Sequence, residues 1–430
     1  MQYIPKSGDS ELGMALYLSA HLRGTGGRIK VGAEDFIVSE VPDLPAKKED
    51  GRFLICRVGS TNWETNRLIR ELSRRLSISR KRIGFAGTKD KRAVTHQFMS
   101  FDGVGPEIIT SLNVRDVTIE PIHRSARQIS IGDLWGNDFD VVVRDCDVFG
   151  SELLSSAKAI FDSLSAEGGF PNFFGVQRFG SLRPNTHLVG LKIIKKDFEG
   201  AVHAYAGNPG ESEDETVRRA RLMFDGGESP SDVLSVLPGV MTFERTMLQH
   251  LVSHPGDYIG SLRQLPPNML MMFVHALQGK LFNEIICDRI RAGLRLDTPE
   301  IGDIILAARE NGLPDRERRI TVDGTNIEAV REQVRLGHGF VSAILFGWKP
   351  LFAGGVQGEI ERKTVERNGL HPEDFIVPEI AECTSSGSRR EMLSPVHDLN
   401  MEADGNKLKL HFRLFKGSYA TSLLREVMKN

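Results

Sequence analysis

A single carboxylate, Asp90, stands between two lysines, Lys89 and Lys91, and Arg92 follows them. Neighbouring positive charges favour the ionised form of an aspartate, and an ionised aspartate can act as a nucleophile or as a base. Runs of charge more often mark a solvated surface turn. The charge pattern alone therefore leaves two interpretations open, a catalytic carboxylate and an exposed turn.

A second group of chemically useful residues lies between positions 171 and 180. Three phenylalanines, an asparagine, a glutamine and an arginine fall within these ten residues. An aromatic ring can stack on an unpaired base, while amide and guanidinium groups reach the edges of that base. An aromatic cluster can equally belong to a hydrophobic core. The sequence leaves these interpretations balanced, with Asn172, Phe174 and Arg178 as the residues of interest.

The stretch that leads to Asp90 is strongly basic. From Arg67 to Arg92 it contains ten basic and two acidic residues, a local balance of +8, although the whole chain has a net charge of −2. A solvated basic helix would have this composition, and so would a surface that follows a phosphate backbone. The residues assigned to such an RNA-binding surface are Arg80, Lys81, Arg82, Lys91 and Arg92, together with Arg178.

A helix and a strand are expected to position Asp90. Apolar residues recur at helical spacing over residues 63–76, which predicts a helix there. The apolar run at residues 83–86 predicts a short buried strand, and Gly87 predicts a tight turn after it. Asp90 would then lie at an exposed corner beyond the strand.

The patterning divides the chain into three segments. Strand patterns dominate residues 28–145, and helical patterns dominate residues 183–345, including one over residues 301–310. Strand character returns after residue 350. We therefore predict an α+β fold in which a β-rich domain, residues 1–182 and 346–430, is interrupted by a mainly helical insertion at residues 183–345.

Composition excludes several protein classes. The 430 residues are 40% hydrophobic and 26% charged, which fits two or three ordinary domains. Four scattered cysteines without a C-x-x-C pair support neither a disulfide framework nor a cysteine zinc site. We see no signal peptide and no apolar run of membrane length, so we expect a cytoplasmic protein without a membrane partner.

One histidine pair has the spacing of metal ligands. His250 and His254 are four residues apart in a predicted helix, and Asp257 would be a third ligand. Pro255 is expected to end the helix before Asp257 can share its face. No metal site is therefore predicted.

Four stretches resemble, in the same order, the TruD family of pseudouridine synthases. The second and third are long and specific, and the four together span nearly the whole chain. One departure is visible, because Leu414-Phe415 stands where the family usually has Leu-Pro. The stretches are residues 29–40, with E-D-F-I-V-S-E; 84–97, G-F-A-G-T-K-D-K-R-A-V-T-H-Q; 172–180, N-F-F-G-V-Q-R-F-G; and 417–426, with G-S-Y-A-T.

The resemblance implies an enzyme that isomerises a uridine of tRNA, typically uridine 13, to pseudouridine without a cofactor. It implies a pseudouridine-synthase-type fold, a mixed and largely antiparallel sheet flanked by helices, in which residues 183–345 are the family-specific insertion into the catalytic domain. Asp90 would be the essential group and Phe174 the aromatic that packs against the extruded base. The other implied pocket positions are Lys30, Phe36, Lys89, Asn172 and Tyr419.

tRNA is the expected partner, no nucleotide cofactor is expected, and a monomer is favoured. The sequence does not select the atom on which Asp90 acts: attack on C1′ of the sugar, addition to C6 of the base and removal of a sugar proton all remain open.

Two other function classes compete with the synthase. A non-catalytic RNA-binding protein would not need Asp90, and an aspartate-nucleophile hydrolase of small molecules would not depend on RNA.

Overall fold

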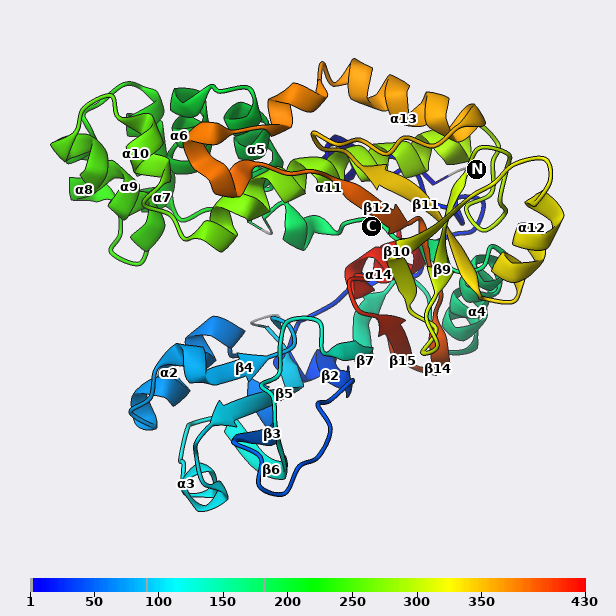
Figure 1. Ribbon diagram of the computed structural model, residues 1–430, viewed down its shortest axis with the longest axis horizontal. Coiled ribbons are helices and arrows are strands. Elements are labelled where there is room, and N and C mark those ends of the chain that lie inside the picture. The colour runs from blue at the N-terminus through cyan, green and yellow to red at the C-terminus, as the bar shows by residue number, and fades with distance from the viewer. Residues whose placement is uncertain (1–2, 90–91, 181) are drawn as a thin grey trace. The chain divides into compact units, whose positions relative to one another are not determined.

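The computed structural model describes residues 3–89, 92–180 and 182–430 (Figure 1). These residues form two compact units. Unit 1 contains Tyr3, Leu18–Phe170 and Ser394–Asn430, and unit 2 contains Ile4–Tyr17 and Pro171–Leu393.

Unit 1 is built on one large sheet. Its strands run in the order β14-β15-β7-β2-β5-β3-β6, with β1 paired to β7 and β4 to β5. Each of these pairings is antiparallel except that of β2 with β5, which confirms the predicted mixed, largely antiparallel sheet. The strands are β1 (Gly26–Arg28), β2 (Phe36–Pro42), β3 (Phe53–Thr61), β4 (Ile83–Phe85), β5 (Val94–Asp102), β6 (Val117–Ser125), β7 (Leu134–Cys146), β14 (His397–Asp404) and β15 (Lys407–Phe415).

Two groups of helices pack on this sheet. The first group covers β2, β7 and β15 through a core that includes Val38 and Leu410. The second covers β3 and β5 through a core that includes Val58 and Met99. The first group is α4 (Gly150–Ala166) and α14 (Ala420–Met428), and the second is α2 (Thr65–Arg75) and α3 (Pro106–Thr110).

Both groups lie on the same face of the sheet. Val38 is paired with Thr95, and Gln97 is paired with Val58. Thr95 and Gln97 are two residues apart on β5, so their side chains point to the same face. Glu40 follows Val38 by two residues on β2 and points to that face as well. The helix-covered face therefore carries Glu40 where the two groups meet.

The last helix holds a segment near the start of the chain. Glu426 on α14 is buried, and its carboxylate accepts hydrogen bonds from the backbone N–H of Leu18 (3.0 Å) and from the N–H (3.2 Å) and Oγ (2.9 Å) of Ser19. The bond to Leu18 joins residues 408 positions apart. Unit 1 is thus closed by contacts between the two ends of the sequence.

Unit 2 combines helices with a four-stranded antiparallel sheet of order β10-β9-β11-β12. Its longest helix, α11 (Pro267–Arg291), is apolar on most sides and packs against α5, α13 and β11. The strands are β9 (Ile304–Ala308), β10 (Pro314–Thr321), β11 (Gly339–Leu345) and β12 (Ser388–Glu391). The other helices are α1 (Ser7–Glu11), α5 (Thr186–Ile194), α6 (Phe198–Ala206), α7 (Glu215–Asp225), α8 (Pro230–Val236), α9 (Thr242–Ser253), α10 (Tyr258–Leu262), α12 (Ile327–Arg335) and α13 (Gly355–Arg367).

The helix predicted over residues 301–310 is wrong. The segment contains β9, whose backbone pairs with β10 on one side and β11 on the other. A short apolar run fits a buried strand as well as a buried helix, and its pairing partners decide between the two. Those partners are distant in sequence for β11, so the local pattern does not reveal them.

The two compact units do not coincide with the predicted domains, whose boundaries stay a prediction. The chain passes between them at 3/4, 17/18, 170/171 and 393/394, and the last two positions fall within the short strands β8 (Phe170–Pro171) and β13 (Leu393–Ser394). The sequence placed the domain boundaries at 182/183 and 345/346. Residues 346–393 belong to unit 2 because β12 pairs with β11 and because α13 packs against α11. Within the segment, Arg389 Nη2 forms a fully buried ion pair with Glu361 Oε1 on α13 (2.7 Å).

Within residues 3–89, 92–180 and 182–430, no helix combines the length and the apolar character needed to cross a bilayer. Even α11, at 25 residues, does not meet these conditions.

Candidate active site

Asp90 and Lys91 lie outside the described residues, but the residue before them is firmly held. Lys89 Nζ lies 2.7 Å from Glu40 Oε1, and the two side chains are 7% and 1% exposed. The backbone N–H of Lys89 donates to Thr65 Oγ1 at the start of α2 (2.9 Å). The second oxygen of Glu40 accepts the N–H of Phe98 on β5 (2.7 Å). Three elements, β2, β5 and α2, therefore anchor the segment that leads to Asp90.

This arrangement pairs the charge of Lys89 with that of Glu40. From the sequence, Lys89 was a candidate for the cation that keeps Asp90 ionised, and Glu40 had no assigned role. A buried ion pair is sensitive to the removal of either partner, because the remaining charge is then buried without compensation. Glu40 and Lys89 consequently depend on each other for their placement.

Lys30 and Phe36 meet at the edge of the unit 1 core. Lys30 Nζ lies 4.2 Å from the centroid of the Phe36 ring, which is a cation–π distance. The ring is 2% exposed and meets Phe139 edge to face at 6.1 Å. Asp35, just before it, accepts from Arg144 Nη2 (2.6 Å), and this hydrogen bond lowers the pKa of Asp35. Phe36 is thus a core residue whose ring is covered by an ammonium group.

Tyr419 caps the start of α14, where its carbonyl oxygen accepts the N–H of Ser422 (2.9 Å). The preceding turn uses Gly417 at φ 85°, a conformation that favours glycine. Leu414-Phe415, which stands where the family usually has Leu-Pro, lies just before this turn. Phe415 stays in β15 opposite Gly136, and its ring meets Trp135 at 5.0 Å. The turn to Tyr419 therefore begins after Phe415.

In unit 2 the side chain of Asn172 is fully buried and bonded at both ends. Its Oδ1 accepts from Arg390 Nη2 (2.7 Å), and its Nδ2 donates to the backbone oxygen (3.2 Å) and to Oε1 (3.1 Å) of Glu391. The sequence suggested this amide as a reader of the uracil edge. In the structure its hydrogen-bonding groups are engaged with β12 instead.

Phe174 is buried as well, at 5% exposure. Guanidinium carbons lie near its ring centroid, that of Arg390 at 4.2 Å and that of Arg178 at 5.2 Å, and Phe282 meets it edge to face at 5.6 Å. Asn283 bridges the Phe174 backbone, since Oδ1 accepts its N–H (2.8 Å) and Nδ2 donates to its carbonyl oxygen (3.1 Å). The ring that was expected to stack on a base is therefore fixed in place on several sides.

The predicted RNA-binding residues are not equivalent in the structure. Arg80, Lys81 and Arg92 are exposed. Arg82 donates to the backbone oxygen of Asp102, so its guanidinium supports the fold. Lys91 lies outside the described residues. Arg178 belongs to unit 2, where it is half-buried beside Phe174.

Part of the positive charge of the basic stretch is neutralised within unit 1. Arg74 and Arg75 both pair with Glu71 on the same helix, at 2.9 and 2.6 Å. Together with the Glu40 pair of Lys89, these interactions lower the charge that can attract an anionic partner below the balance of +8 counted from the sequence.

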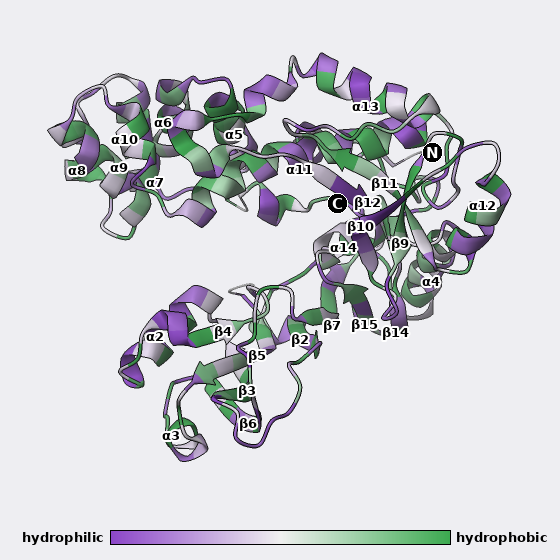
Figure 2. Ribbon diagram, viewed as in Figure 1, coloured by the Kyte–Doolittle hydropathy of each residue, from purple (hydrophilic) through white to green (hydrophobic). Residues whose placement is uncertain are grey.

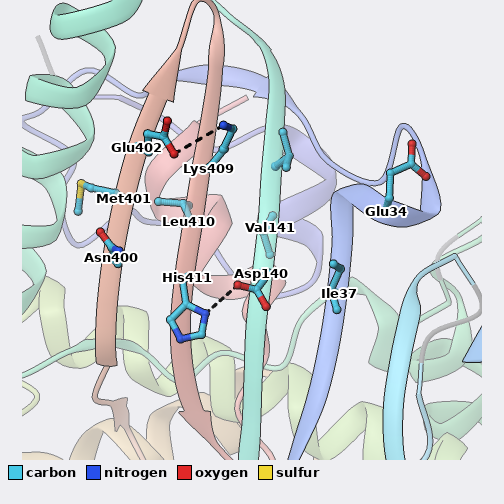
Figure 3. Close-up of a pocket in the computed structure, with 11 residues that line it drawn as sticks. Glu34, Ile37, Asp140, Val141, Asn400, Met401, Glu402, Lys409, Leu410 and His411 are labelled. Carbon is cyan, nitrogen blue, oxygen red and sulfur yellow. Dashed lines mark hydrogen bonds and ion pairs between the residues drawn. The ribbon is translucent and has the colours of Figure 1, made fainter. Parts of the chain in front are cut away.

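A depression of about 270 Å³ lies on the opposite face of the unit 1 sheet, and Figure 3 shows the residues that line it. Ile37 lines it, whereas its neighbours Phe36 and Val38 point into the core, so the depression faces away from Glu40. His411 Nδ1 bonds Asp140 Oδ1 there (2.8 Å). None of the predicted site residues that the structure describes lines this depression.

The described residues contain no group of three or more His, Cys, Asp or Glu side chains placed to hold a metal ion. Helix α9 ends at Ser253, before Pro255, as expected. Asp257 nevertheless reaches His250, whose Nε2 lies 2.8 Å from Asp257 Oδ2, and this contact lowers the pKa of Asp257. The His250 ring also stacks on His254 at 4.6 Å.

A family model for tRNA pseudouridine synthase D (TruD) matches residues 11–427. The chain belongs to the TruD family. It is 41% identical to the probable tRNA pseudouridine synthase D of Methanococcoides burtonii over 98% of this chain and 97% of that protein, and 39% identical to that of Methanosarcina mazei over 98% and 97%. The crystal structure of the putative tRNA pseudouridine synthase D from Methanosarcina mazei superposes with a TM-score of 0.83 at 38% identity, covering 98% of this chain and 97% of that one.

Membership in the TruD family confirms the resemblance drawn from the four stretches, and the structural match confirms the fold class. The chain is accordingly an isomerase of the tRNA pseudouridine synthase class. Around the TruD motifs, sequence reasoning missed Glu40, Thr65 and Arg390. Glu40 could have been found, because it occupies an inward position of a strand whose other inward residues are apolar. Arg390 gave no comparable signal, because β12 is a short and hydrophilic strand (Figure 2).

Proposed function

We propose that this TruD-family protein converts uridine 13 of tRNA to pseudouridine, with Asp90 as the reacting carboxylate and without a cofactor. The family model over residues 11–427 supports the reaction class. The observation that carries the assignment of Asp90 is the anchoring of its neighbour, Lys89, by Glu40 and Thr65. A surface turn has no need of a buried ion pair at its base, whereas a reacting group has to be held in place.

The chemistry requires little besides a carboxylate and a pocket. The N1–C1′ bond of uridine breaks and a C5–C1′ bond forms, while C5 loses a proton and N1 gains one. No electrons are exchanged and no group leaves, so the balance calls for neither a redox cofactor nor an energy source. Asp90 can take part by attacking C1′, by adding to C6 or by removing a sugar proton, and each route keeps this balance.

The target uridine has to leave its stack before it can react. We assign Phe174 as the aromatic surface that receives the base, a contact worth roughly 1–3 kcal/mol. Because the ring is 5% exposed, a covering side chain has to move before a base can stack on it.

tRNA binding requires contacts to phosphate groups. We assign these to Arg80, Lys81 and Arg92, which are exposed. We assign the chemistry to unit 1, which contains the anchored segment, and a role in tRNA binding to the predicted insertion at residues 183–345, the described part of which lies within unit 2.

The test is to map pseudouridine in an unmodified tRNA transcript after incubation with the protein, using carbodiimide labelling followed by mass spectrometry. We expect pseudouridine at position 13 with the wild type and none with Asp90→Asn. A transcript with cytidine at position 13 is the matched substrate control. Modification at another position would refute the site assignment but keep the reaction, and an active Asp90→Asn enzyme would refute the role of Asp90.

A further inference from the structure

The fully buried Asn172 is the starting point, because neither of its polar groups faces a substrate. Its oxygen receives a hydrogen bond from Arg390 and its nitrogen is fixed by Glu391. The backbone N–H of Asn172 also donates to the carbonyl oxygen of Met392 (2.8 Å), so residue 172 is aligned along the end of β12. What this amide does in the structure is to set the orientation of the Arg390 guanidinium.

Arg390 in turn lies against Phe174. It is 3% exposed, and its guanidinium carbon lies 4.2 Å from the centre of the Phe174 ring. A planar guanidinium stacks on an aromatic face, and the geometry of its fork fixes the plane in which it lies. Asn172 therefore acts on Phe174 through Arg390.

The other neighbours of the ring leave it little room to shift. A Cβ atom built on Gly279 of α11 would lie 3.1 Å from Phe174 Cγ, so the glycine gives the ring its slot in the helix surface. Phe282 meets the ring edge and Asn283 holds the Phe174 backbone. Of the two guanidinium groups beside the ring, that of Arg390 lies nearer to the ring centroid, at 4.2 Å compared with 5.2 Å for Arg178.

We infer that Arg390, oriented by Asn172, is a positioning residue that fixes the plane of the Phe174 ring against which the target base stacks. The inference rests on the proposed role of Phe174. In this account Asn172 does not read the base; it orients Arg390, and Arg390 in turn positions Phe174. Arg390 does not contact substrate in this account, so its removal affects the rate of the isomerisation and not the recognition of tRNA phosphates.

The neighbouring residue provides a matched control. Arg389 is on the same short strand and is equally buried, but its guanidinium pairs with Glu361 and with Ser342, away from Phe174. Arg389→Lys and Arg390→Lys thus remove the same group from adjacent positions of β12. Only the second change alters the support of the Phe174 ring.

The experiment measures kcat and KM for tRNA, together with the thermal unfolding midpoint, for Arg390→Lys, Arg389→Lys, Phe174→Leu and the double variant. We expect Arg390→Lys to lower kcat by about tenfold or more, since small misplacements of reacting groups carry such costs. KM should stay within about threefold, because phosphate contacts dominate affinity. Arg389→Lys should lower the unfolding midpoint while kcat stays within about twofold, as expected of a change that breaks a buried hydrogen-bonded network away from Phe174.

The double variant distinguishes positioning from an independent role. In the Phe174→Leu background, Arg390→Lys should lower kcat by less than about twofold, because two residues that act through one another are not additive. Equal reductions in both backgrounds, or wild-type kcat for Arg390→Lys, would overturn the inference. A wild-type kcat for Phe174→Leu alone would refute the proposed role of the ring, and with it the inference, without involving Arg390.

Should Arg390→Lys fail to fold, Asn172→Ser tests the same connection from its other end. Serine removes the side-chain oxygen that accepts from Arg390 Nη2 at 2.7 Å and leaves only the longer contact, 3.4 Å, to the backbone oxygen of residue 172. The same reduction of kcat and the same non-additivity with Phe174→Leu are expected. Additive reductions would count against the connection.

Discussion

The ammonium group of Lys89 lies 2.7 Å from the Glu40 carboxylate in a place where neither side chain is more than 7% exposed. Lys89 is the last described residue before Asp90. The ion pair therefore links the strand β2 to the segment in which the reacting carboxylate is proposed to lie.

Replacing Glu40 by Gln should destabilise unit 1, because it leaves the Lys89 charge buried without a counter-charge. Removal of one partner of a buried pair costs about 3–5 kcal/mol. Urea unfolding followed by tryptophan fluorescence measures the decrease in stability. Glu402→Gln, which removes an exposed partner 3.6 Å from Lys409, is the control and should cost about 1 kcal/mol or less.

The double variant Glu40→Gln, Lys89→Met should recover much of that stability, because an apolar replacement of a buried pair is often neutral. It should not recover pseudouridine formation if the pair serves to place the segment before Asp90. Full activity in the double variant would show that the pair is structural only.

Acid should destabilise unit 2 through His187. Burial, together with the positive charge of Lys280, lowers the pKa of His187 from 6.5 to about 4. The unfolded chain then binds a proton in the window between these values while the folded protein does not, so stability falls as the pH drops from 6.5 towards 4. The decrease at pH 5 is about 2 kcal/mol. Urea unfolding at pH 7.5 and pH 5 should show it in the wild type, and His187→Gln should reduce the difference by that amount.

Gly279→Ala tests the slot of Phe174 without changing any polar group. The new methyl would meet the ring at 3.1 Å, so the ring has to shift, and kcat for pseudouridine formation should fall. The helix itself gains about 1 kcal/mol of intrinsic propensity from the change, which offsets part of the strain. Gly239→Ala, where a Cβ meets nothing within 4 Å, is the control and should leave kcat unaltered. A fall of equal size in both variants would rule out an effect specific to the ring.

Replacing Arg80 and Lys81 by Ala should weaken the binding of tRNAs of different sequence to the same extent. Both side chains are exposed, and each phosphate that is no longer neutralised should reduce the slope of log K against log salt by about 0.7–0.9. Fluorescence anisotropy with labelled tRNA at several salt concentrations measures this slope. Lys158→Ala with Lys409→Ala removes two charges of the same sign elsewhere in unit 1 and should leave the slope unaltered. Equal effects of the two double variants would show a general charge effect.

The sequence was sufficient where the information is local. The helix predicted at residues 63–76 is α2, and the short buried strand predicted at residues 83–86 is β4, because a local pattern of apolar residues is enough to indicate each of them. The long TruD motif located Asp90, although its geometry lies outside the described residues. The partners of the motif residues were harder to find. Glu40 precedes Lys89 by 49 positions in the chain, and Arg390 follows Asn172 by 218.

The helix wrongly expected at residues 301–310 has the same cause. The pattern I-I-L-A-A fits either structure, and only pairing with β11 and β10 decides in favour of the strand. The contacts of Asn172 in the structure differ from the expected contact with a base for a related reason. An amide in a motif can read a base or hold a neighbour, and the choice depends on Arg390, which the local sequence does not reveal.

The hydrogen bond between Glu426 and Leu18 joins two segments of unit 1 that are synthesised far apart in time, and this separation affects the order in which the units can fold. Strands β14 and β15 and helix α14 are synthesised after all other described parts of the two units, and the sheet and core of unit 1 are incomplete without them. Unit 2 needs only residues that have been made by position 393. Unit 2 can therefore reach its native packing first, while residues 18–170 still lack the strands and the helix that complete their sheet and core. A nascent chain stalled between residues 393 and 426 would be the form most in need of a chaperone.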